Sequence, residues 1–132
     1  MNTEHIQLLH STNRTIGGPR FRHEQNQLVV EYDFQYDDGS VKWSELIFRD
    51  VLAVDYRQFA CCADESVVDS NEVHSKAEST WLSEVLARWN ETVGWLDWQK
   101  RQGGASRFRH FSVFFDDAGC INTIATSCEV VS

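Results

Sequence analysis

The 132-residue chain has no long apolar run, and no stretch approaches the roughly 20 apolar residues that a transmembrane helix requires. Its first ten residues also lack a basic segment followed by an apolar one, so no secretory signal is expected. Both absences exclude the common membrane-anchored and exported classes. The sequence therefore predicts a cytoplasmic protein in which the four cysteines stay reduced.

The motifs of the well-marked enzyme classes are missing as well. There is no G-x-S-x-G, no P-loop, no G-x-G-x-x-G and no H-E-x-x-H. No cysteine pair has C-x₂-C spacing, and Cys120 and Cys128, eight residues apart on an expected strand, would stand roughly 26 Å apart. We expect no cofactor and no metal, and we rank a binding protein ahead of an enzyme.

Basic residues are few: 12 Lys and Arg stand against 20 Asp and Glu, which gives a net charge of −8 and a pI of about 5.0. An acidic surface repels phosphate backbones, so nucleic acid is a poor partner. The same charge suits a basic protein partner, since complementary potentials speed encounter. It is also compatible with a surface that serves only to keep an ordinary protein in solution.

What the chain does have is enough apolar material for one core. At 132 residues and 42% hydrophobic residues it fits a single domain spanning 1–132. Alternating apolar and polar residues predict strands, and the ranges are 27–37, 41–49, 51–59, 111–115 and 120–131. The polar segment 61–76 shows no such period and is expected to be a surface loop.

A helix is expected to begin near Ser79 or Thr80, either of which could be its N-cap. Apolar residues then recur at helical spacing and form a seam suited to packing on a sheet; they are Leu82, Val85, Leu86, Trp89, Val93 and Leu96. Gly103-Gly104 would end it. The expected fold is α+β, with an antiparallel sheet of about five strands packed on one main helix, in the order β-β-β-α-β-β.

Two carboxylate pairs, Asp37-Asp38 and Asp116-Asp117, could be cation or acid–base sites on paper. Each is followed closely by glycine at an expected hairpin turn, where Asp is favoured for backbone reasons alone. We therefore interpret both pairs as turns.

The tetrapeptide Arg-Phe-Arg-His occurs twice, each time before or at the start of an expected strand. If the copies lie side by side, they form a basic patch able to bind an anion. The residues of this candidate anion site are Arg20, Arg22, His23, Arg107, Arg109 and His110. It supports the alternative function, a small-ligand protein or enzyme with a pocket between sheet and helix.

Acidity concentrates between residues 64 and 97, where eight acidic residues face two basic ones. This stretch is either a solvated helix face or a surface for a basic protein, with tryptophans as aromatic anchors. The candidate partner-binding residues are Asp64, Glu65, Asp69, Glu72, Glu78, Glu84, Glu91, Trp95 and Trp98. A second acidic surface is the strand face of Glu31, Asp33 and Asp37.

The segment from His110 to Cys120, continued by residues 121–131, and the helix start Ser79-Thr80-Trp81-Leu82 resemble small bacterial proteins, some of them immunity proteins of toxin systems. The likeness covers the C-terminal half of the chain and carries no catalytic residue. It implies a cytosolic, non-enzymatic protein that neutralises a basic toxin domain by occluding it. The favoured function is therefore an immunity-type inhibitor.

Overall fold

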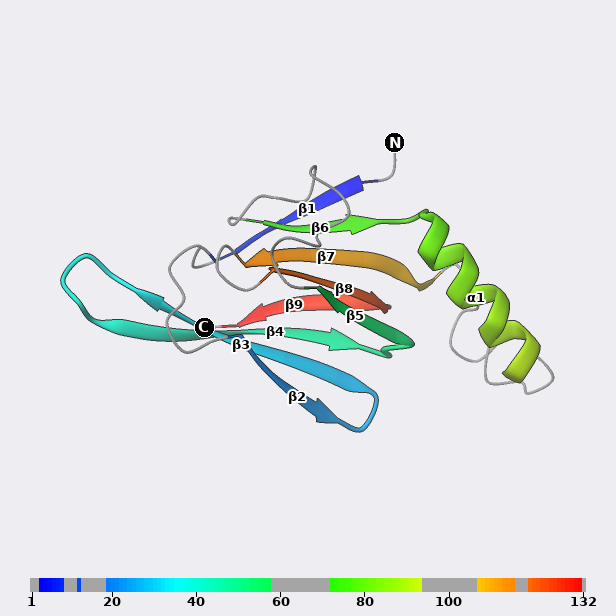
Figure 1. The fold of residues 1–132 in the computed structure, drawn as a ribbon, viewed down its shortest axis with the longest axis horizontal. Helices are drawn as coiled ribbons and strands as arrows, with labels where there is room; N and C mark the ends of the chain where they lie inside the picture. The colour runs from blue at the N-terminus through cyan, green and yellow to red at the C-terminus, as the bar shows by residue number, and fades with distance from the viewer. Residues whose placement is uncertain are drawn as a thin grey trace.

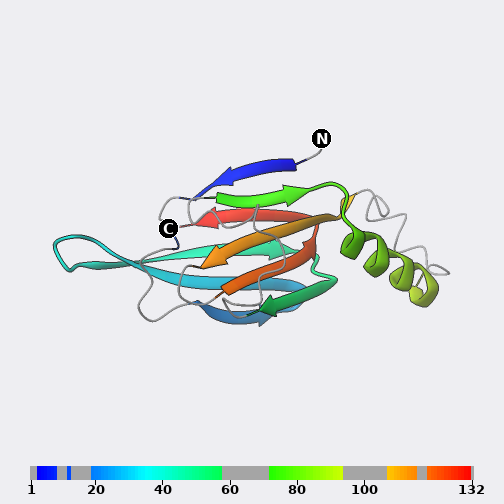
Figure 2. The same ribbon diagram turned by 45° about the horizontal axis from the view of Figure 1, so that its top comes forward.

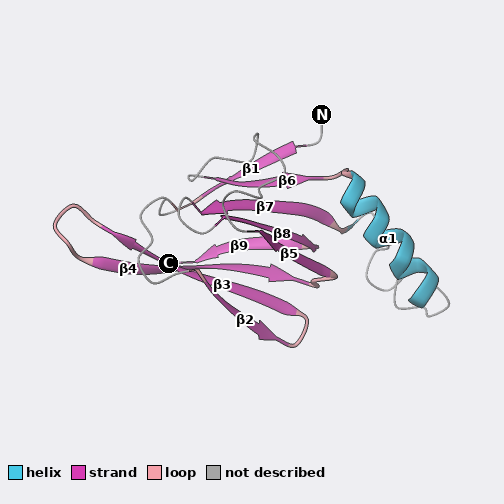
Figure 3. Ribbon diagram, viewed as in Figure 1, coloured by secondary structure: helices cyan, strands magenta, loops and turns pink. Residues whose placement is uncertain are grey.

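The computed structural model describes residues 3–8, 12, 19–57, 72–93, 107–115 and 119–131; for residues 3–5 and 89–93 only the backbone is described. Most of this part of the chain is strand, with a single helix (Figure 3). The elements are β1 (Thr3–Gln7), β2 (Arg20–Glu24), β3 (Gln27–Gln35), β4 (Val41–Arg49), β5 (Ala53–Arg57), β6 (Glu72–Lys76), α1 (Thr80–Val93), β7 (Arg109–Phe115), β8 (Gly119–Ala125) and β9 (Ser127–Val131).

The strands form two antiparallel sheets, not the single sheet expected from the sequence (Figures 1 and 2). Sheet A has five strands in the order β1-β6-β7-β8-β5, and sheet B has four in the order β2-β3-β4-β9. An α+β arrangement with antiparallel sheets is therefore confirmed, while the sheet count and strand order were wrong. Residue alternation shows which side chains share a face, but it does not tell which strand lies next to which.

The core lies between the two sheets. Strands β3 and β4 supply one set of buried side chains and β6, β7 and β8 the other. Tyr32 meets Phe115 edge to face at 5.6 Å between ring centroids, and Phe48 meets Phe111 at 5.7 Å. Burying one such ring stabilises the fold by roughly 1.5–3 kcal/mol before ordering costs, so these contacts hold sheet to sheet.

Two of the points at which the chain passes between the sheets lie side by side. One is Asp50, between β4 and β5, whose positive φ of 53° is a conformation that Asp tolerates better than most residues. The other is Thr126, where the expected strand 120–131 divides into β8 in sheet A and β9 in sheet B. Asp50 Oδ2 accepts a hydrogen bond from Thr126 Oγ1 at 2.8 Å, and Asp50 Oδ1 accepts one from Asn26 Nδ2 at 2.7 Å. A single carboxylate thus joins both crossings to the β2–β3 turn.

The expected helix start is confirmed. Helix α1 begins at Thr80, and Ser79 caps it by accepting a hydrogen bond from the Leu82 N–H at 3.1 Å. Leu82 packs with Phe108 and Ile124 on the outer face of sheet A. The helix covers only one end of that face and extends away from the sheets (Figures 1 and 2). Within the described ranges no helix is long and apolar enough to cross a membrane.

Part of the expected loop 61–76 is a strand. β6 lies between β1 and β7 in sheet A, and its central residues Val73, His74 and Ser75 are buried. Side chains on both faces of β6 are buried, so its sequence does not alternate between apolar and polar residues. The strand is also short, and the sequence therefore showed no period of two. Residues 61–71 lie outside the described part of the chain, as do Gly103 and Gly104.

The turn predicted at Asp37-Asp38 is confirmed. Gly39 has a φ of +88°, and Asp38 accepts hydrogen bonds from the Ser40 N–H at 2.9 Å and the Ser40 hydroxyl at 2.6 Å. The β3–β4 hairpin that this turn closes projects beyond the other strands (Figure 1). Asp116-Asp117 falls outside the described residues.

Of the two cysteines in the described ranges, one differs from expectation. Cys120, on β8, takes part in a disulfide bond, whereas the sequence predicted reduced thiols throughout. Cys61 and Cys62 lie outside the described residues. Cys128 on β9 is free, and burial raises the pKa of its thiol to about 12, as expected for a cysteine that acts as a small apolar side chain.

Candidate functional site

A pocket of about 620 Å³ opens on the outer face of sheet A, beside the first turns of α1. Its floor comes from β7 and β8, its walls from β5 and α1, and one end from β6. The lining residues are Ala53, Val54, Asp55, Arg57, Lys76, Thr80, Trp81, Glu84, His110, Ser112, Cys120 and Asn122. Several of them, including Arg57 and Glu84, are exposed, so the pocket is open to solvent.

Strand register explains why these residues meet. Lys76 pairs with His110 and His110 with Ile124, while Ser112 pairs with Asn122 and Asn122 with Asp55. These residues form two neighbouring rows that run across four strands, and each strand lies about 4.8 Å from the next. Side chains in such rows project from one face of the sheet. The helix packs on Ile124, while Lys76 and His110 of the same row and the members of the next row line the pocket.

A hydrogen-bonded chain fixes the floor of the pocket. His110 Nδ1 lies 2.8 Å from Ser79 Oγ, and His110 Nε2 lies 2.8 Å from Asn122 Oδ1. Ser112 Oγ donates to the same Asn122 oxygen at 2.7 Å. Because Asn122 Oδ1 can only accept, the arrangement that satisfies every group has Nε2–H donating to Asn122 and Nδ1 accepting from the Ser79 hydroxyl.

The helix cap and the pocket floor are therefore one structure. Ser79 accepts from the backbone of α1 and contacts His110 through the same oxygen. Trp81, one residue into the helix, meets the His110 ring edge to face at 5.1 Å between centroids. These contacts hold the imidazole in one orientation. Ser112, beneath it, is only 2% exposed, which makes its hydrogen bonds stronger than they would be at the surface.

Charges of both signs line the pocket. Arg57 Nε donates to Asp55 Oδ2 at 2.9 Å, so these two β5 side chains neutralise each other. Lys76 lies at the β6 side and Glu84 on the helix. The lining thus includes two acidic and two basic side chains, so the pocket offers contacts to ligand groups of either charge.

The structure places only some of the expected partner-binding residues. Glu78 and Glu84 are exposed at the start of α1, and Glu84 lines the pocket. Glu72 is half-buried at the start of β6. Those outside the described ranges, or described by backbone alone, are Asp64, Glu65, Asp69, Glu91, Trp95 and Trp98.

The two Arg-Phe-Arg-His segments lie in different sheets, the first on β2 of sheet B and the second at the start of β7 in sheet A. Arg109 donates to Ser75 Oγ at 2.5 Å and to the Ser75 carbonyl at 3.1 Å. Arg107 lies 3.4 Å from Asp50. Each arginine has its own local partner, so the segments do not form one basic patch.

Of the six residues in that candidate anion site, His110 alone lines the pocket. Arg20 stacks on Trp43, with its guanidinium carbon 4.3 Å from the ring centroid, and His23 is exposed on the edge strand β2. The cations that do line the pocket are Arg57 and Lys76. Sequence spacing gave no sign of them, because they come from strands far apart in the chain.

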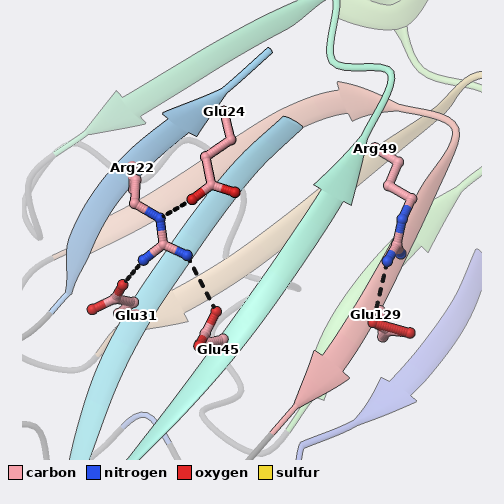
Figure 4. Close-up of polar contacts among 6 residues, drawn as sticks. All are labelled: Arg22, Glu24, Glu31, Glu45, Arg49 and Glu129. Carbon is pink, nitrogen blue, oxygen red and sulfur yellow. Dashed lines mark hydrogen bonds and ion pairs between the residues drawn. The ribbon is translucent and has the colours of Figure 1, made fainter. Parts of the chain in front are cut away.

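Charged side chains also pair with one another on the outer face of sheet B (Figure 4). Arg22 contacts three carboxylates: Glu24 at 2.6 Å, Glu45 at 3.7 Å, and Glu31. The hydrogen bond to Glu24, with the nearby negative charges, raises the pKa of Arg22 further. Asp33 is only 3% exposed. The expected acidic strand face is therefore wrong in part: Glu31 is paired and Asp33 is buried, while Asp37 is exposed.

Within the described ranges, no group of three or more His, Cys, Asp or Glu is arranged to hold a metal ion. Compared with protein families, with curated proteins and with solved structures, the chain matches none of them.

Proposed function

We propose that this chain is a non-enzymatic binding protein that occludes a basic protein partner, as an immunity-type inhibitor occludes a toxin domain. The observation that carries the proposal is the open pocket beside α1: the exposed Glu84 lines it, and the exposed Glu78 precedes Ser79, which contacts the lining residue His110. Neither carboxylate forms an ion pair with a described residue, so both are available to a basic side chain. The net charge of −8 adds long-range attraction for such a partner.

The contacts of His110 fix the shape of the pocket floor. One ring nitrogen is engaged by Ser79 and the other by Asn122. A partner that enters the pocket therefore meets an imidazole held in one orientation.

The test is capture of a partner from the native host at low salt, followed by measurement of affinity with charge-reversed variants. Glu78→Lys with Glu84→Lys should weaken binding at least about tenfold, because it replaces two attractive charges beside the pocket with repulsive ones. The matched control is Glu24→Lys with Glu129→Lys, which changes the net charge equally on the outer face of sheet B.

The control should lose much less affinity, and raising the salt should narrow the difference between the two variants. Equal losses in both variants would show that only net charge matters. The proposal would be contradicted by two results together. The native host yields no bound partner, and the variant with Glu78→Lys and Glu84→Lys binds every basic protein tested as tightly as the unchanged chain does.

A second candidate, binding of a small anion, is favoured by the presence of Arg57 and Lys76 in the pocket. A volume of about 620 Å³ lies within the roughly 300–1,000 Å³ typical of ligand pockets. A phosphate- or carboxylate-bearing compound at 100 times its Kd would stabilise the protein by about 2.7 kcal/mol. Thermal-shift screening should then show a stabilisation that Lys76→Gln removes and Lys42→Gln, on the projecting hairpin, leaves unchanged.

A further inference from the structure

Strand β5 forms one edge of sheet A. On one side it pairs with β8 over its whole length, from Ala53 opposite Ile124 to Arg57 opposite Cys120. On the other side no described strand pairs with it. An edge strand exposes a row of backbone N–H and C=O groups that can pair with another extended segment.

Apolar side chains lie on the inward side of this edge. Val54 and Tyr56 are 39% and 42% exposed, and Phe21 of β2 is 43% exposed. The rings of Phe21 and Tyr56 lie 5.5 Å apart, so the edges of the two sheets meet there. A contiguous group of exposed apolar side chains marks an interaction surface more reliably than the same residues scattered singly. We call this group the edge patch.

The pocket lies on the outward side of the same edge. Ala53, Asp55 and Arg57 alternate with Val54 and Tyr56 along β5 and line the pocket, and Val54 borders both the pocket and the edge patch. One five-residue strand thus separates an apolar patch from a polar pocket. A segment that paired with β5 would place alternate side chains on these two surfaces, because successive strand residues point to opposite faces.

We propose that β5 receives an extended segment of the partner protein, which adds a strand to sheet A. This proposal rests on the proposed protein-binding function and specifies how the partner is held. The segment has alternating apolar and basic residues: the apolar ones cover Phe21, Val54 and Tyr56, and the basic ones enter the pocket beside Glu84. Backbone pairing supplies affinity, and the two side-chain surfaces supply specificity, as in other cases of strand addition.

The first test uses a blocked decapeptide of alternating valine and lysine with the full chain labelled for NMR. Binding should slow amide exchange at residues 53–57 and shift the Val54 and Tyr56 signals. The same peptide with every lysine replaced by glutamate should bind more weakly. A version methylated on alternate backbone nitrogens, which cannot pair with an edge, should not protect β5 at all.

Tyr56→Asp and Val54→Asp should each lower peptide affinity by about tenfold, the loss expected when an apolar anchor is removed. Val41→Asp is the matched control, because Val41 is equally exposed, at 44%, but lies on the β3–β4 hairpin. It should change affinity by less than about twofold. Equal losses in the three variants would overturn the assignment of the edge patch.

Absence of protection at β5 with millimolar peptide would overturn strand addition even if a basic partner is captured through Glu78 and Glu84. A mass in sedimentation equilibrium of twice the monomer, restored to the monomer by Tyr56→Asp, would also overturn it, since the edge would then be occupied by a second copy. Protection at β5 in a protein that captures no partner would leave the edge assignment standing and the proposed function contradicted.

Discussion

The outer faces of the two sheets are built from strands with similar alternation, yet they have become different surfaces. On sheet A the polar side chains lie partly beneath a helix and form a fixed network, in which His110 contacts Ser79 and Asn122 at 2.8 Å each. On sheet B no helix of the described chain covers the strands, and Arg22 and Glu24 are about half exposed although they form an ion pair. The two outer faces differ because a helix covers part of sheet A, more than because the residue composition of their strands differs.

Cover changes what each contact contributes. A hydrogen bond in a site with little water is strengthened by the low local dielectric, and its loss leaves a buried polar group unsatisfied. An exposed ion pair competes with water and salt and contributes little to stability. The covered face therefore has the fixed geometry that recognition requires, while the open face keeps its charges paired and solvated.

The two sheets are held against each other where the chain crosses from one to the other. We therefore expect Asp50→Ala, at one of these crossings, to cause the largest loss of stability. This change removes the hydrogen bonds from Asn26, Thr126 and Arg107 but keeps the positive φ that alanine tolerates poorly. We expect the free energy of unfolding to fall by about 3 kcal/mol, measured by urea denaturation.

Two further variants separate the causes. Asp50→Asn keeps an acceptor for Thr126 and should lose roughly half as much stability, about 1.5 kcal/mol. Asp50→Gly relieves the backbone but loses every side-chain contact. If Asp50→Gly is as stable as the unchanged protein, the backbone conformation and not the carboxylate determines the stability of the crossing.

On the covered face, His110→Ala should lower the free energy of unfolding by about 2 kcal/mol, since it removes two hydrogen bonds and the contact with the Trp81 ring. A double-mutant cycle with Asn122→Ala should show coupling of about 1 kcal/mol. If the losses of the two single variants simply add, the His110 and Asn122 side chains are not energetically coupled. The outer face of sheet A would then not hold a cooperative network that sheet B lacks.

The sequence predicted the elements whose signals are local. The alternation of 27–37 gave β3, the Asp38-Gly39 pair gave its turn, and Ser79 gave the cap of α1. It missed β2, which is an exposed edge strand that reads Arg-Phe-Arg-His-Glu and is followed by a turn at Gln25 and Asn26 without glycine. It also missed the break at Thr126, because a strand can change sheets without any turn residue.

The candidate site was less accessible to sequence analysis. A pocket between sheet and helix was expected, and His110 was named among its residues, but Arg20, Arg22 and His23 lie in the other sheet. Its other lining side chains come from strands as distant in sequence as β5 and β8. Their meeting depends on strand order, which alternation within each strand does not encode.

On the open face, Arg22→Ala should change stability much less than His110→Ala, although Arg22 contacts three glutamates. The guanidinium is exposed, and its ion pairs are screened by water and salt. Urea denaturation at about 20 mM and 1 M salt should show the small loss disappearing at high salt. A loss as large as that of His110→Ala, or one that salt leaves unchanged, would show that this cluster is structural and would erase the distinction between the faces.

We expect the smallest change in stability at the tip of the β3–β4 hairpin, which projects beyond the other strands. Hydrogen bonds from the Ser40 hydroxyl and backbone lower the pKa of Asp38 below its ordinary value of 3.8. The turn therefore gains stability that is present above the ordinary pKa and is lost as the pH falls through the lowered one. An NMR titration of the Asp38 carboxyl should show the lowered pKa, and Ser40→Ala should move it back toward 3.8, with unchanged signals at His110 and Asn122. If Ser40→Ala shifts the pocket signals at a fixed pH, the pocket on sheet A is coupled to the hairpin of sheet B, and the two faces are not independent.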